Sequence, residues 1–291
     1  MKDTRGEKVF YRFNYALLAL MGLSCVLPIV HIVAVSLSSK HAVMSGFVSV
    51  WPVEANLESY KALVEGTGVV RAFGNSTVIT IVGTTLSMFF TILAAYPLSR
   101  SYFYFRKGFT LLIVFTILFS GGTVPTYLVY NALGLVNTYA PIWLHTLVNA
   151  FFMLVMKSFF EGIPQEMEEA ARIDGSSEWR LILTIMLPLS KPVLATLTLF
   201  YGVAFWNNFQ HVLIYVHDVS RLNLTVLVRN MIDSARLMHL LNEYAHELIE
   251  VITPAGVQAA GVVVLVAPLM VVYPFLQKYF VKGVMIGAIK G

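Results

Sequence analysis

The chain has 291 residues, of which 57% are hydrophobic and only 12% are charged. Soluble domains carry about 25% charged residues, so this composition excludes an ordinary soluble globule. The net charge of +4 comes from Lys and Arg residues dispersed among the loops, and it does not indicate nucleic-acid binding.

The N-terminal segment carries several Lys and Arg residues and is followed by an apolar run over about 13–37. This run is longer than the apolar region of a usual signal peptide, so we predict an uncleaved membrane span; a cleaved signal is the alternative. The single cysteine, Cys25, lies in this run, which excludes a disulfide within the chain. We expect it to be a buried, inert thiol.

Further apolar segments are long enough to cross a hydrocarbon core of about 30 Å. Each is predicted to be a helix, because only internal hydrogen bonds satisfy a backbone that faces lipid. With the first span, the sequence predicts an all-α membrane protein with six transmembrane helices. The later spans are about 73–98, 109–131, 140–160, 192–215 and 257–280.

The distribution of positive charge predicts the orientation. Cytoplasmic segments of membrane proteins are enriched in Lys and Arg. With the N-terminus inside, the outer segments hold only a minority of the 20 Lys and Arg residues: Lys40, Lys61, Arg71, Arg221, Arg229 and Arg236. Both termini and the loop over 161–191 are therefore predicted to be cytoplasmic.

Two long segments, about 38–72 and 216–256, are then predicted outside. The second has an amphipathic helical pattern around 222–250. Either it is a solvated lid or it docks an external partner, and the sequence leaves both open. No low-complexity linker or internal repeat divides the chain, so residues 1–291 are predicted to form a single domain.

The predicted cytoplasmic loop, 161–191, is the most polar segment between two spans. Pro164 suits the first turn of a helix, where its missing N–H costs nothing. Ala170 and Ala171 are expected to give this helix a narrow surface that another protein can approach. The early turns, where the helix dipole favours negative charge, hold Glu166, Glu168 and Glu169.

A sharp corner and a second helix are predicted to follow. Asp174 and Gly175 end the first helix, because glycine readily adopts the left-handed conformation. Ser176 or Ser177 can cap a second helix that runs towards Pro188. Such an element either docks a partner or rests on the membrane surface, and anionic headgroups would repel its acidic residues. We therefore favour partner docking.

The motif in this loop resembles the EAA loop of ABC importer permeases. The stretch Glu169-Ala-Ala-Arg-Ile-Asp-Gly175, followed by Ile185-Met-Leu-Pro188, matches every position of that pattern. In the family this loop forms a coupling helix in a cleft of the ATP-hydrolysing subunit. The resemblance thus implies ATPase coupling for Glu169, Ala170, Ala171, Asp174, Gly175, Leu187 and Pro188.

The similarity extends along the chain. Gly134-Leu-Val-Asn-Thr138 and Pro188-Leu-Ser-Lys-Pro192 resemble the second permease of carbohydrate importers, the maltose-type, MalG-like branch. The pair Gly121-Gly122 and the run to Tyr127 resemble the subgroup for complex oligosaccharides, such as alginate or aldouronate fragments. A core over about 69–281 and a cytoplasmic tail over 281–291 are implied.

The resemblance implies a type I ABC importer permease fold in the bacterial cytoplasmic (inner) membrane. Its partners would be a homologous second permease in a heterodimer, two ATPase subunits that dock on the 161–191 loop, an extracytoplasmic solute-binding protein and a carbohydrate. The chain has no Gly-x-x-x-x-Gly-Lys-Ser/Thr phosphate loop, so it is expected not to be an enzyme. ATP and Mg would be bound by the ATPase subunits, and no metal or cofactor is expected in this chain.

Two other functions are alternatives: a permease for a non-sugar solute, and an ion-coupled secondary transporter. The second is disfavoured, because ionisable residues within spans usually mark ion pathways and are scarce here.

Polar and aromatic side chains in the predicted spans are candidates for the substrate path. Sugars stack on aromatic faces and bond to amides, whereas Asn and Gln can equally join membrane helices to each other. The candidates are Trp206, Asn207, Gln210, Tyr127 and Asn131.

Overall fold

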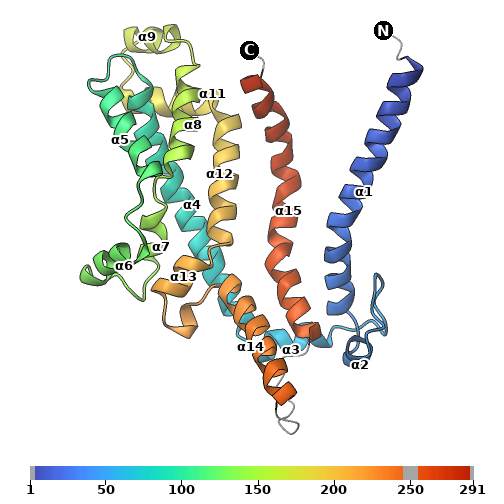
Figure 1. Cartoon of the computed structure of the whole chain (residues 1–291). Helices are drawn as coiled ribbons and strands as arrows, with labels where there is room; N and C mark the ends of the chain where they lie inside the picture. Colours follow the sequence, from blue (N-terminus) through green and yellow to red (C-terminus); the bar gives the residue numbers. More distant parts are fainter. Residues whose placement is uncertain (1–3, 245–254, 289–291) are drawn as a thin grey trace. The chain divides into compact units, whose positions relative to one another are not determined.

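The computed structural model describes residues 4–244 and 255–288, and every regular element in these ranges is helical (Figure 1). The α-helices are α1 (Arg5–Ser36), α2 (Lys40–Met44), α3 (Glu58–Gly66), α4 (Val69–Ser99), α5 (Arg106–Leu118), α6 (Thr123–Ala132), α7 (Ala140–His145), α8 (Ala150–Glu161), α9 (Glu166–Ile173), α10 (Glu178–Leu181), α11 (Leu187–Leu189), α12 (Lys191–Trp206), α13 (Gln210–Tyr215), α14 (Leu224–Tyr244) and α15 (Ala255–Ala288). A π-helical turn covers Ile182–Met186, and a 3-10 turn covers Val219–Arg221.

The chain forms two compact units. The first consists of Met1–Val70 and Leu227–Pro268, and the second of Arg71–Val226 and Leu269–Gly291. The prediction that residues 1–291 are a single domain stays a prediction. The end of the tail, 289–291, and residues 245–254 of the predicted outer segment lie outside the described residues.

Three stretches of helix in the described residues are long and apolar enough to cross a membrane: Gly6–Ser36, Val69–Ser99 and Ala255–Pro274. Two further candidates are pairs of helices bent at a short break. α5 and α6 bend by 112°, and the helical segment Glu178–Leu189 bends by 86° against α12. The predicted span 109–131 is thus a bent pair, and the predicted span 140–160 is divided between α7 and α8. The six-span arrangement stays a prediction.

Helix α1 begins with a reciprocal cap and presents an apolar surface. The Thr4 side chain accepts a hydrogen bond from the Glu7 N–H, and the Glu7 carboxylate accepts one from the Thr4 N–H. In the most apolar 18-residue segment of α1, only 6% is buried against the rest of the chain. Cys25 is exposed on this helix, so the expectation of a buried thiol is wrong for the chain by itself, because the described residues cover little of α1.

In the second unit, α4, α8 and α12 enclose the main core. Hydrogen bonds tie these helices together at Tyr201, whose hydroxyl lies 2.8 Å from Thr91 Oγ1 and accepts from the Asn149 N–H at 2.9 Å. Trp143 donates to the Ile79 carbonyl at 3.2 Å. Fully or almost fully buried apolar side chains fill the space: Ile79, Ala95, Ile142, Met153, Met156, Phe160, Leu197 and Phe205.

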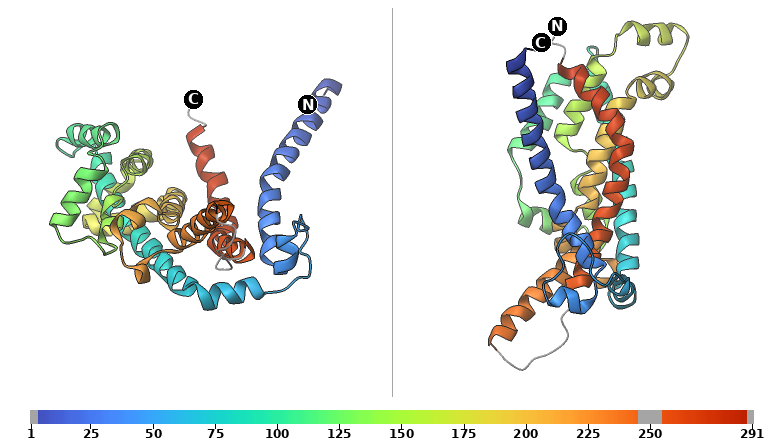
Figure 2. Two further views of the ribbon diagram at one scale, coloured as in Figure 1. Left: turned by 60° about the horizontal axis from the view of Figure 1, so that its bottom comes forward. Right: turned by 90° about the vertical axis from the view of Figure 1, so that its right-hand side faces the viewer.

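The helices of this unit have two distinct ends. At one end α9 projects beyond α5 and α8, as both Figure 1 and the right-hand view of Figure 2 show. Helices α6, α7 and α13 gather at the opposite end (Figure 1). The polar loop and the candidate path residues Tyr127, Asn131 and Gln210 are therefore separated along the length of α4.

Helices α4 and α12 approach each other at a glycine. A Cβ placed on Gly83 would lie 2.8 Å from three atoms of the Phe205 ring. We expect Gly83→Ala to lower stability by about 1–3 kcal/mol, because an overpacked core must shift side chains or backbone. Thermal unfolding of the purified, detergent-solubilised complex would measure this loss.

Gly74→Ala on the same helix is the matched control, because a Cβ added to Gly74 would meet no described residue within 4 Å beyond its own helix backbone and its chain neighbours. Equal unfolding temperatures for the two variants would contradict the close approach at Gly83.

Candidate functional site: the loop between α8 and α12

Helix α9 starts slightly later than the sequence predicts. Pro164 lies outside the helix, which begins at Glu166 after Gln165 as its N-cap. The first turn still carries three carboxylates at the positive end of the helix dipole: Glu166, Glu168 and Glu169.

The predicted corner is confirmed. Gly175 has φ +77°, the left-handed conformation that glycine adopts without steric cost. Asp174 is the C-cap, and its N–H donates to the Ala170 carbonyl at 3.1 Å. Ser177 caps α10 by accepting from the Arg180 N–H. Backbone conformation and capping residues therefore favour the direction in which the chain returns towards α12.

Helix α9 has a buried and an exposed face. Glu168 and Ala171, three residues apart, point into the second unit and are almost inaccessible. Glu169 and Ala170 lie on the exposed side. The prediction that Ala170 and Ala171 form one surface for a partner is wrong for Ala171, because the helix turns by about 100° per residue and places position 171 beneath position 168.

A buried ion pair anchors this inner face. Arg100, just after the end of α4, lies 2.6 Å from Glu168, and their side chains are only 2% and 5% exposed. The guanidinium also lies over the Tyr96 ring and donates to the Met186 sulfur at 3.5 Å. The Nε of Arg100 has no hydrogen-bond partner among the described residues.

Burial dominates the electrostatics of Glu168. Removal from water raises the pKa of this carboxyl above its usual value, although Arg100 and Arg172 act to lower it. An arginine cannot lose its proton in this way, so the two partners respond differently when one of them is removed.

A second, more exposed network holds the corner. Arg172 lies 2.6 Å from Glu178 and donates to the Tyr102 hydroxyl at 2.7 Å. Tyr96 donates to the same Glu178 carboxylate at 2.9 Å. Half-exposed pairs contribute about 0–1 kcal/mol each, so this network orients α9 and α10 more than it stabilises them.

The outer surface of the loop combines acidic and apolar side chains. Ile173 is 87% exposed and Trp179 is 58% exposed, with Met167 and Leu183 also accessible. Large apolar side chains gathered on a protruding element, beside carboxylates, are typical of a protein interface. Of the remaining motif residues, Pro188 is exposed and Leu187 is partly buried.

The predicted path residues are dispersed. Trp206 is buried, and its ring packs edge-on against Phe73 at 5.6 Å, which favours a packing role. Asn207 caps the C-terminus of α12, and Gln210 opens α13, so the predicted span 192–215 is interrupted between them. Both side chains are exposed, as is Asn131 on α6.

Tyr127 belongs to an aromatic cluster that the sequence analysis did not assemble. Its ring stacks on Tyr215 with centroids 6.0 Å apart, and Tyr130 meets Tyr215 edge-on at 5.3 Å. His211 stacks on Tyr215 and lies 4.3 Å from the His145 ring. The i, i+4 spacing of His211 and Tyr215 on one helix is the signal that could have identified it.

We expect Glu168→Met to destabilise the folded protein more than Arg100→Met does. Removing one member of a buried pair costs about 3–5 kcal/mol, but Glu168 left alone can take up a proton whereas Arg100 cannot lose one. The raised pKa of Glu168 favours folding below the pKa of the unfolded carboxyl, and this contribution is lost as the pH rises through the folded value. The Arg100→Met defect should therefore be smaller at pH 5 than at pH 8 in thermal unfolding.

The double variant Arg100→Met/Glu168→Met should recover most of the lost stability. Arg172→Met, in the half-exposed pair, is the control and should cost no more than about 1 kcal/mol. Equal losses for Arg100→Met and Arg172→Met would contradict a buried anchor.

Comparison with known proteins places this architecture in a family. Residues 76–286 match the family described as binding-protein-dependent transport system inner membrane component. LplC of Bacillus subtilis (strain 168) is 37% identical over 292 aligned residues, covering 100% of this chain and 98% of that protein.

The polygalacturonan/rhamnogalacturonan transport system permease YtcP of the same organism is 36% identical, covering 98% of this chain and 99% of that protein. The crystal structure of a bacterial ABC transporter involved in the import of the acidic polysaccharide alginate contains a chain that superposes with a TM-score of 0.86. It shares 29% identity, and the match covers 96% of this chain and 99% of that chain. The chain therefore belongs to the family of inner-membrane components of binding-protein-dependent transport systems.

Proposed function

We propose that this chain is the permease subunit of an ABC importer for carbohydrate, and that its substrate is an oligosaccharide of the alginate or aldouronate type. Relatives that match over nearly the whole chain are named for polygalacturonan/rhamnogalacturonan transport or take part in alginate import. The family consists of transport permeases, so ATP hydrolysis belongs to other subunits.

The proposed arrangement in the inner membrane has six transmembrane helices with both termini in the cytoplasm and one domain over residues 1–291. The excess of Lys and Arg in the predicted inner segments supports this orientation. It places α9 on the cytoplasmic side and α6, α7 and α13 towards the outside.

The proposed partners are a homologous second permease, two ATPase subunits that bind ATP and Mg, and an external solute-binding protein. The family name supports a separate binding protein. The uncovered apolar surface of α1 supports lipid or a second permease as its neighbour, since this chain buries little of it.

The observation that carries the coupling role is the buried Arg100–Glu168 pair. It fixes the inner face of α9 to the end of α4 at 2.6 Å. Helix α4 is in turn bonded to α12 through Thr91 and Tyr201 and packs against it closely at Gly83. A displacement of α9 would thus be carried into the helices that line the proposed path.

We assign the motif residues to two tasks. Glu169, Ala170 and Asp174 face outwards and would contact an ATPase subunit, together with the exposed Ile173 and Trp179. Ala171, Gly175, Leu187 and Pro188 would maintain the shape of the loop between α8 and α12. ATP-driven closure of the ATPase pair would draw the coupling helices together and open the cavity outwards, where the binding protein releases its sugar.

The proposed path uses Tyr127 and His211, which pack on the buried ring of Tyr215, with Asn131, Asn207 and Gln210 supplying amide groups. Stacked aromatic rings offer flat apolar faces to sugars. Trp206 is assigned to the packing beneath the break between α12 and α13, because its ring contacts Phe73.

We expect Glu169→Lys to lower ATP-driven uptake at least tenfold, because it reverses the charge on the face proposed to dock the ATPase. Uptake would be measured in proteoliposomes that contain the complete complex, with alginate and polygalacturonate oligosaccharides as probes. Co-purification of the ATPase subunits should fall in parallel.

Glu65→Lys, an exposed charge reversal on α3, is the control and should retain both properties. Normal uptake and normal ATPase association in Glu169→Lys would refute docking through α9.

For the path, Tyr127→Ala should lower uptake about fivefold while ATPase association stays unchanged. An aromatic contact contributes about 0.5–1.5 kcal/mol, and the substitution removes one stacking face. Tyr104→Ala is the control, because Tyr104 is a highly exposed tyrosine outside this cluster. Unchanged uptake in Tyr127→Ala would indicate that the aromatic cluster packs the helices together and does not contact the substrate.

A further inference from the structure

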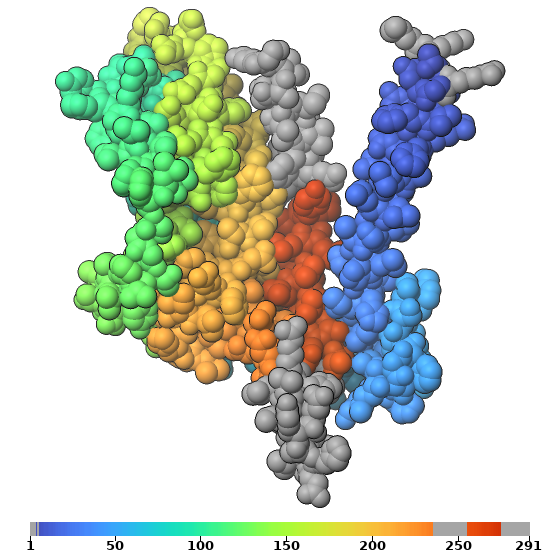
Figure 3. Space-filling view, viewed as in Figure 1, coloured from blue at the N-terminus to red at the C-terminus, as the bar shows by residue number. Residues whose placement is uncertain are grey.

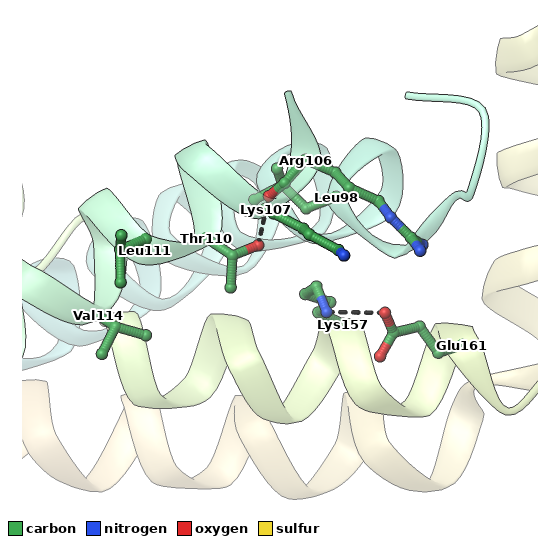
Figure 4. Close-up of a pocket in the computed structure, with 8 residues that line it drawn as sticks. All are labelled: Leu98, Arg106, Lys107, Thr110, Leu111, Val114, Lys157 and Glu161. Atoms are coloured by element: carbon green, nitrogen blue, oxygen red, sulfur yellow. Dashed lines mark hydrogen bonds and ion pairs between the residues drawn. The ribbon is translucent and has the colours of Figure 1, made fainter. Parts of the chain in front are cut away.

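A cavity of about 360 Å³ lies between α5 and α8, at a place that the coupling mechanism does not use (Figure 4). Arg106 and Lys107 border it from α5, and Lys157 and Glu161 border it from α8. Figure 4 shows Lys107 and Lys157 extending from opposite helices towards the same gap. Figure 3 shows the surfaces of α5 (green) and α8 (yellow-green) side by side in the second unit.

The charges around this cavity do not balance. Three cationic side chains meet a single carboxylate, Glu161, which lies 2.7 Å from Lys157. Neither Arg106 nor Lys107 forms an ion pair among the residues that the structure describes. The cavity therefore has a surplus of positive charge that an anion would neutralise.

The start of α5 reinforces this surplus. Arg106 and Lys107 occupy the first turn, where the helix dipole already places partial positive charge. No acidic residue lies in that turn, and no side chain caps it; the N-cap position is Phe105, with φ 60°. Cations are disfavoured at this end of a helix, so an anion beside Arg106 and Lys107 would relieve the repulsion.

Apart from Thr110, whose hydroxyl donates to the Arg106 carbonyl, the remaining wall of the cavity is apolar. Leu111 and Val114 follow Lys107 at the i+4 and i+7 positions, on the same face of α5. Leu98, from the end of α4, is buried and also lines the cavity, near Arg106 (Figure 4). A ligand that fits both parts has an anionic head for the cations and a hydrocarbon tail for Leu111 and Val114.

We propose that this cavity binds the phosphate headgroup of an anionic membrane lipid, with an acyl chain along α5. Basic pockets between membrane helices near a membrane surface are suited to such headgroups. A free phosphate ion would satisfy Lys107 and Arg106 but would leave the apolar wall without a partner.

The test uses the complete transporter complex in detergent, titrated separately with phosphatidylglycerol, phosphatidylcholine and inorganic phosphate, with bound lipid counted by native mass spectrometry. Each charge near a membrane surface contributes about 1 kcal/mol, which is about fivefold in affinity. Lys107→Gln should therefore weaken phosphatidylglycerol binding about fivefold. Glu161→Gln should strengthen it, because Lys157 is released from its carboxylate.

Lys8→Gln, on the exposed first turns of α1, controls for general attraction of lipid to positive charge and should leave this binding unchanged. Opposite effects of Lys107→Gln and Glu161→Gln would support the site. The proposal is overturned if both variants lower binding equally, if neither changes it, or if phosphatidylcholine binds as tightly as phosphatidylglycerol. Displacement of the lipid by equimolar inorganic phosphate would also overturn it, in favour of a small-anion site.

Discussion

The Arg100–Glu168 ion pair is the contact on which the arrangement of the polar loop depends. Two nearly inaccessible charges lie 2.6 Å apart, and the guanidinium keeps one N–H without a partner among the described residues. Burying such a pair yields little net stability, because desolvation offsets most of the attraction. The ion pair instead determines the position of α9. An apolar pair could pack α9 against α4 in several registers, whereas a single short charged contact allows only one register. The coupling role proposed for this loop would need that uniqueness more than stability.

The same reasoning applies along the helices. Where the chain breaks between α7 and α8, backbone groups lose their helical partners, and side chains replace them. Asn149 caps α8 by accepting from the Phe152 N–H, and the Tyr201 hydroxyl accepts from the Asn149 N–H. Tyr201 also hydrogen-bonds to Thr91 on α4. One hydroxyl therefore provides a partner for the backbone N–H at the break and joins α12 to α4. Breaks at membrane depth are tolerated only where protein supplies such partners. The break between α7 and α8 is thus held by side-chain hydrogen bonds within the second unit.

Local signals in the sequence were sufficient to predict the corner of the loop. Gly175 and Ser177 act through their own backbone and side chain, and the structure has both where they were expected. Contacts between distant residues could not be predicted in this way. Nothing near Arg100 in sequence indicates that Glu168, far along the chain, would reach it. The breaks at 119–122 and 207–209 were also missed, although the first contains Gly121 and Gly122 and the second Asn207 and Asn208, because such residues can equally lie within a membrane helix that packs against its neighbours.

Glu168 and Glu169 show how one short helix can serve two purposes. They are adjacent and chemically almost identical, yet the rotation of about 100° per residue directs the first inwards and the second outwards. The inner carboxylate is desolvated and paired with Arg100 at the end of α4, so it resists displacement. The outer one is exposed, as are Ile173 and Trp179, and is accessible to a partner. A partner that binds the outer face therefore pulls on an element whose other face is already fixed to the helix bundle. In the proposed coupling, docking and transmission would occupy opposite faces of α9, whose inner face is held by the Arg100–Glu168 pair and whose end is held by the Arg172–Glu178 pair.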